Sequence, residues 1–134
     1  MSGFSDLFLG PRERGRRRQC EFHLKVAEPM RAGALRYDEK LWRDYFDELE
    51  RAVAARPETI EAHWLRAEAL QHWFVTFNPP RKEPETREMA RTWNNDITFI
   101  LTNYPDRDLP SVSLNAARAM RREFEVQTRG VKIE

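Results

Sequence analysis

The pattern of hydrophobic and polar positions divides the chain into helical segments separated by proline-containing breaks. In the clearest segment, apolar side chains recur every three or four residues and form one stripe. The stripe consists of Leu41, Trp42, Tyr45, Phe46, Leu49, Ala52 and Val53. Asp38 is suited to cap the first turn, and Arg56-Pro57 ends the segment. This pattern predicts an amphipathic helix over 38–55.

Three further helices are predicted downstream. The first runs from Pro57 to about Phe77 and is apolar nearly all round, which is typical of a central helix. Three prolines within 78–84 then indicate a loop. The next helix covers 85–103. The last is capped by Ser111, buries Leu114, Ala117, Met120 and Phe124, and stops near Gly130.

The N-terminal segment is compatible with two structures. Cys20, Phe22, Leu24 and Val26 alternate with polar residues, which is strand spacing, and the last four residues alternate as well. A short β pairing between these terminal segments is one interpretation, and a helix over 12–27 is the other. The helix is favoured because the remaining chain is helical. The predicted fold is therefore all-α: a compact bundle of four main helices in a single domain over 19–134, preceded by an N-terminal arm over 1–18.

The junction between the first two predicted helices, Leu49 to Leu70, resembles the seam between two tetratricopeptide repeats. In that family a helix ends with an alanine five residues before a proline, as Ala52 precedes Pro57 here. The next helix opens with an acidic residue and an alanine before an aromatic one, as Glu61, Ala62 and Trp64 do. The resemblance covers about 22 of 134 residues, and no period of about 34 residues continues beyond it. It implies a tight antiparallel hairpin and favours a role in partner binding.

Composition excludes several classes of protein. The 134 residues are 40% hydrophobic and carry a formal net charge of +1, too little for a protein that coats DNA. Nineteen of the 23 basic residues are arginine, a bias typical of a GC-rich genome. The single cysteine, Cys20, rules out an internal disulfide and a cysteine-based zinc site. No apolar run approaches the length of a membrane span, and the N-terminus lacks a secretory pattern. We expect a cytoplasmic protein, or a virion component if a phage encodes it.

No motif indicates catalysis, a metal or a cofactor. His63 and His72 are nine residues apart, so they face opposite sides of a helix and cannot share an ion. Glycine-rich phosphate loops and the HExxH zinc motif are absent from the sequence. Cys20 follows three arginines but has no nucleophile signature around it, which favours a buried apolar role. We therefore predict a non-enzymatic protein without catalytic, metal-binding or cofactor-binding residues.

The distribution of charged and apolar residues predicts two kinds of contact surface. Candidate protein contacts are the apolar side chains at helical spacing in the N-terminal tail and the acidic side chains of the 38–55 helix. These residues are Phe4, Leu7, Phe8, Asp38, Asp44, Asp47 and Glu48. Candidate nucleic-acid contacts are two arginine clusters, whose guanidinium groups suit phosphates. They consist of Arg12, Arg14, Arg16, Arg17, Arg18, Arg118, Arg121 and Arg122.

Three functions fit these surfaces. The first is a helical adaptor or structural subunit that docks into a larger protein assembly, cytoplasmic or phage-type, through the arm and the acidic helix. Their opposite charges would also permit self-association. The second is a small nucleic-acid-binding protein that uses the arginine clusters. The third is an inhibitor that occupies a partner's site by charge mimicry, using the acidic side chains.

Overall fold

The computed structural model describes residues 10–104, 108 and 112–133, and this part of the chain is all-α. Five of its helices have 14 residues or more, and a 3-10 turn and a one-turn helix connect the first two of them. The elements are α2 (Pro11–Ala27), η1 (Glu28–Met30), α3 (Arg31–Ala34), α4 (Glu39–Ala55), α5 (Ile60–Phe77), α6 (Pro84–Asn103) and α7 (Leu114–Gln127).

Helix starts follow the local capping chemistry. Asp38 caps α4 as predicted: its Oδ1 accepts from the backbone N–H groups of Lys40 at 3.0 Å and Leu41 at 3.2 Å. The prediction for α5 was wrong by three residues, because Pro57 lies in the turn before the helix and α5 begins at Ile60. In α7 the cap is Ser113, whose Oγ accepts from the N–H of Ala116 at 3.3 Å. The predicted cap, Ser111, lies outside the described residues.

The N-terminal segment is a helix, so the strand alternative and the terminal β pairing were wrong. Pro11 starts α2 at a position where the missing N–H costs nothing, and Cys20 and Ala27 are buried on its inner side. The segment 131–133 contains no strand, and its apolar side chains pack against the core instead. Because α2 is a fifth long helix, the count of four main helices was too low. The predicted boundary at residue 18 falls within α2, so residues 11–18 continue directly into 19–27.

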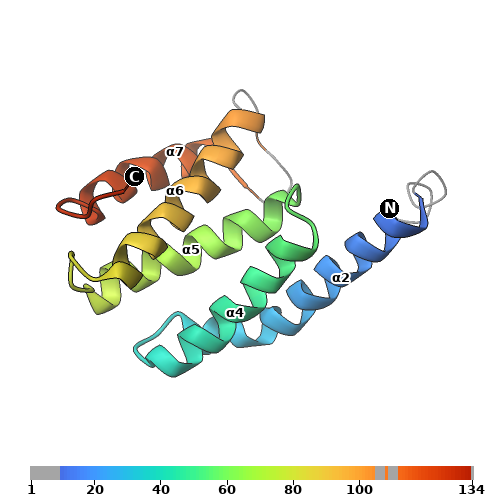
Figure 1. Ribbon diagram of the computed structural model, residues 1–134, viewed down its shortest axis with the longest axis horizontal. Coiled ribbons are helices and arrows are strands. Elements are labelled where there is room, and N and C mark those ends of the chain that lie inside the picture. Colours follow the sequence, from blue (N-terminus) through green and yellow to red (C-terminus); the bar gives the residue numbers. More distant parts are fainter. Residues whose placement is uncertain (1–9, 105–107, 109–111, 134) are drawn as a thin grey trace.

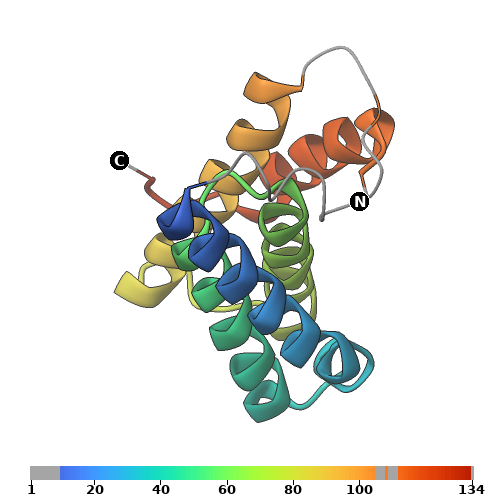
Figure 2. The ribbon, with the colours of Figure 1, turned by 90° about the vertical axis from the view of Figure 1, so that its right-hand side faces the viewer.

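Helices that follow one another in sequence pack as neighbours, and Figure 1 shows them side by side from α2 to α7. Helix α5 contacts α4, α6 and α7, which makes it the central helix that its apolar pattern predicts. Figure 2 separates α4 and α6 on one side from α5 and α7 on the other. Helix α2 packs mainly on α4, so it forms one end of the arrangement, and α7 forms the other.

A line of aromatic rings runs through the core and links four helices. Trp42 of α4 stacks on Trp73 of α5 at 5.8 Å between ring centroids, and Phe74 stacks on Trp93 of α6 at 5.3 Å. Trp93 meets Phe124 of α7 edge-on at 5.1 Å. Such pairs add to the large apolar area that each ring removes from water. This core fixes the position of α4 and α5, which carry part of the candidate site.

Candidate functional site

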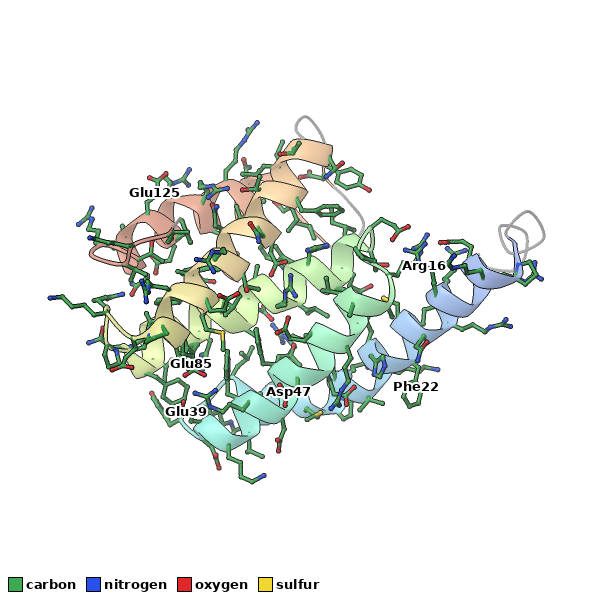
Figure 3. The ribbon with its side chains drawn as sticks, viewed as in Figure 1. Arg16, Phe22, Glu39, Asp47, Glu85 and Glu125 are labelled. Carbon is green, nitrogen blue, oxygen red and sulfur yellow. The ribbon has the colours of Figure 1, made fainter. Side chains whose placement is uncertain are left out.

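The predicted acidic contact residues of α4 are largely engaged by neighbouring groups. Asp38 caps the helix, and Asp44 pairs with Lys40 at 3.2 Å. Glu48 accepts from Arg51 at 2.6 Å and lies 2.9 Å from His23 Nδ1. Asp47 is exposed and projects from α4, as Figure 3 shows, and makes no ion pair with a described residue. The acidic side of α4 is therefore mostly neutralised within the protein.

The apolar contact residues of the tail, Phe4, Leu7 and Phe8, lie outside the described residues.

The first arginine cluster contributes to the packing of α2. Arg16 donates to Glu13 at 2.5 Å and to Glu58, in the turn before α5, at 2.6 Å. Arg17 lies 3.6 Å from Glu21 on the next turn, and Arg14 is half-buried. Figure 3 shows Arg16 near the start of α2.

The other two arginines of this cluster are exposed. Arg12 and Arg18 have no acidic partner among the described residues. Both therefore present an uncompensated charge on the surface of α2.

The second arginine cluster lies on α7 and is separate from the first. Arg121 donates to Asn94 at 2.6 Å and to Thr98 at 2.8 Å, and its burial lowers the pKa of the guanidinium group. Arg118 and Arg122 are exposed on the same helix. Helices α2 and α7 stand at opposite ends of the molecule in Figure 1, with α4, α5 and α6 between them. The two clusters therefore do not form one continuous basic surface.

A groove between α2 and α5 has a volume of about 720 Å³. We call it the α2–α5 groove. Its apolar lining comes from α2, α4 and α5 and consists of Phe22, Leu24, Ala27, Tyr45 and Leu65. Its charged lining contains three basic and three acidic residues: Arg18, Lys25, Arg31, Glu21, Glu28 and Glu61. The groove thus combines an apolar floor with charges of both signs.

Helical spacing explains how α2 supplies most of this lining. Arg18, Phe22 and Lys25 follow one another at intervals of four and three residues and so share one side of the helix. Phe22 is 60% exposed, although it is a large apolar residue, and Figure 3 shows it projecting from α2. Its ring touches only the edge of the His23 ring, at 5.3 Å between centroids, among the aromatic contacts of the described residues. An exposed phenylalanine beside an apolar groove is typical of a binding surface.

Tyr45 forms the part of the groove lining that belongs to α4. The residue is only 1% exposed, and its hydroxyl has no hydrogen-bond partner among the described residues. Burial raises the pKa of the phenol to about 12, and the charge of Glu68 contributes in the same direction. The group is therefore a neutral donor at physiological pH. The indole N–H groups of Trp73 and Trp93 also lack partners, but neither residue lines the groove.

A buried charge network lies between α5 and α6, away from the groove. Asp96 is fully buried and receives two hydrogen bonds from Arg66, at 2.7 and 2.8 Å. His63 places Nδ1 2.7 Å from Asp96 and Nε2 2.5 Å from the carbonyl oxygen of Pro57. Every one of these side chains is engaged by another. The network therefore joins the two helices and the preceding turn.

The remaining chemistry-bearing residues are also used in packing. His72 contacts the carbonyl oxygen of Arg36 at 2.6 Å, whereas His63 contacts Asp96. The two histidines therefore face different neighbours, as the nine-residue spacing between them predicts. Cys20 is buried, and burial raises the pKa of its thiol, which keeps it protonated. No group of three metal-ligating side chains comes together among the described residues. In the same part of the chain, no helix has the length and apolar character needed to cross a membrane.

Sequence reasoning missed the α2–α5 groove and the Asp96 network. The groove residues come from three separate stretches of the sequence, and only the position of Phe22 among polar neighbours gave a signal for the groove. No family model, curated protein or solved structure matches. The function must therefore be argued from the surface of the protein itself.

Proposed function

We propose that the protein is a non-catalytic helical adaptor or structural subunit that binds a peptide segment of a partner protein in the α2–α5 groove. The observation that carries this proposal is Tyr45, which lines the groove and whose buried hydroxyl has no hydrogen-bond partner among the described residues. A buried hydroxyl left unpaired costs about 1–3 kcal/mol, so a ligand that accepts its hydrogen bond recovers part of that cost.

The dimensions of the groove suit a short peptide. Its lining along α2 and into the first residue of η1 extends from Arg18 to Glu28, a length of about 15 Å at the helical rise. The volume of about 720 Å³ lies within the range of ligand-binding pockets, about 300–1,000 Å³. A peptide of a few residues in extended form, or two to three helical turns, covers this length.

The lining defines the chemistry of the partner segment. The partner is expected to insert a large apolar side chain between Phe22 and Leu65 and to offer a carbonyl oxygen to the Tyr45 hydroxyl. Charged groups on both sides of the floor would set the direction of the peptide, because Arg18 and Lys25 favour acidic side chains and Glu28 favours basic ones. The resemblance of the α4–α5 junction to a tetratricopeptide seam also favours partner binding.

This proposal moves the main contact surface from the acidic helix to the groove. Because Asp44 and Glu48 are paired internally, they are poor mimics of an acidic ligand, which weighs against the charge-mimic inhibitor. The separation of the two arginine clusters weighs against a nucleic-acid surface that uses both. The N-terminal tail remains a second predicted contact through Phe4, Leu7 and Phe8.

A peptide-display selection tests the proposal. Random peptides selected on the wild-type protein should share a bulky apolar residue and should lose binding to Phe22→Asp. Val126→Asp is the matched control, because Val126 is also exposed, at 46%, but lies on α7. Both substitutions add one negative charge at an exposed position and leave the core intact. Peptides that bind Phe22→Asp as tightly as the wild type would contradict the proposal.

A further inference from the structure

A second hollow lies where the loop after α5, the first turns of α6 and the segment after α7 meet. Its volume is about 340 Å³, and four of its five lining residues are basic: Arg81, Lys82, Arg87 and Lys132, with Gly130 as the fifth. We call it the basic hollow. Gly130 has a φ of 84°, the left-handed conformation that favours glycine, and it reverses the chain after α7 so that Lys132 reaches the site.

The four basic side chains are not neutralised by acidic neighbours. Arg81 donates to the carbonyl oxygen of Gln127 and, at 3.3 Å, to the side-chain oxygen of Asn78, both of which are neutral. The side chains of the other three are exposed and form no ion pair with a described residue. These contacts hold the Arg81 guanidinium group in place while its charge remains uncompensated.

Two of the three acidic residues around the start of α6 are directed to other partners. Glu85 accepts two hydrogen bonds from Arg43 of α4, both at 2.9 Å, and Figure 3 shows it next to Glu39, which binds the same arginine. Glu88 accepts from Arg91 at 2.6 Å. Glu83 precedes the helix and its side chain makes no capping hydrogen bond. The positive charge of the basic hollow is therefore largely unopposed.

This concentration of charge is unfavourable unless an anion is bound. Four cations around one hollow repel each other, and two of them, Lys82 and Arg87, flank the N-terminus of α6. The helix dipole makes that end positive, so basic groups there lower stability while an anion there raises it. Guanidinium and ammonium groups are the side-chain donors that bind phosphate oxygens most strongly, and the hollow contains two of each.

We propose that the basic hollow is a binding site for a small anion with more than one phosphate group. The volume is at the lower end of the range for ligand pockets, which suits a diphosphate-sized group better than a larger ligand. The same chemistry is present in free pyrophosphate and in the backbone of a nucleic acid, so the test includes both sources. The site is remote from the α2–α5 groove and shares no lining residue with it.

Isothermal titration calorimetry with pyrophosphate at low ionic strength tests this site. The double variant Arg87→Gln, Lys132→Gln should bind pyrophosphate at least ~10-fold more weakly, because each removed charge-assisted hydrogen bond contributes more than a neutral one. The control is Arg12→Gln, Arg122→Gln, which removes the same charge from exposed positions on α2 and α7. This control should bind as the wild type does. Equal binding by both double variants would overturn the proposal.

Thermal unfolding and a short single-stranded oligonucleotide complete the test. Pyrophosphate should raise the melting temperature of the wild type and leave that of Arg87→Gln, Lys132→Gln unchanged. Without an anion this variant should melt at the same temperature as the wild type or higher, because repulsion is relieved. Binding of the oligonucleotide through the same two residues, in addition to pyrophosphate, supports the site and assigns a nucleic-acid source. Binding of the oligonucleotide without any response to pyrophosphate overturns a small-anion site.

Discussion

Replacing Tyr45 by phenylalanine removes the buried hydroxyl of a residue that lines the α2–α5 groove and leaves the ring in place. The residue is 1% exposed and its hydroxyl has no hydrogen-bond partner among the described residues. Removing an unpaired buried hydroxyl relieves its desolvation cost, so Tyr45→Phe should raise the free energy of unfolding by about 1 kcal/mol. For a chain of this size, that corresponds to an increase of about 3 °C in the melting temperature. The same substitution should weaken peptide binding in the groove.

Differential scanning calorimetry of the wild type and Tyr45→Phe measures the stability difference. Tyr37→Phe is the matched control, because Tyr37 is 86% exposed and its hydroxyl is in water, so no change is expected. A decrease in stability of about 1 kcal/mol for Tyr45→Phe is the value typical of a lost hydrogen bond. That result would show that the hydroxyl is satisfied in the free protein, and it would remove the observation on which the peptide-binding proposal rests.

Three further predictions concern the charges. Asp96→Asn should lower the free energy of unfolding by about 3–5 kcal/mol in chemical denaturation, because it removes the buried carboxylate of Arg66 and leaves only its partner at the surface, Glu50. Hydrogen bonds from Arg43 lower the pKa of Glu85. This pair therefore stabilises the fold at any pH above the ordinary carboxylate pKa. The stabilisation is lost as the pH falls through the lowered pKa. Arg43→Gln should therefore flatten the acidic limb of a plot of melting temperature against pH, and an unchanged limb would contradict this assignment. In a mobility-shift assay, any binding of nucleic acid should fall steeply between ~50 and ~200 mM salt, and the absence of a shift at the lower salt would exclude phosphate contacts by α2.

Most of the helices could be predicted because each buries a regular apolar stripe. Helix α4 and its cap at Asp38 follow directly from the spacing of side chains in 38–55. The start of α5 was placed too early because Pro57 is acceptable in a first helical turn, whereas here its carbonyl group contacts His63 and it lies in the connecting turn. Helix α2 was ambiguous because its buried residues are few and small, and its packing on α4 stabilises the helix instead of a strand.

The binding surfaces were harder to predict because sequence shows charges and not their partners. Glu48 looked like a surface charge, although His23 and Arg51 engage it. The α2–α5 groove combines residues from three segments that are far apart in the sequence, and the basic hollow combines two, 81–87 and 130–132. Only the packing of the helices brings these groups together.

The most direct test of the central claim is a two-dimensional NMR titration of the wild-type protein with a peptide obtained from the display selection. The account predicts that the largest chemical-shift changes fall on the amides of the groove, around Phe22, Leu24, Tyr45 and Leu65. Changes centred instead on α7, or on the acidic side of α4, would contradict it, because the peptide would then bind a surface other than the groove.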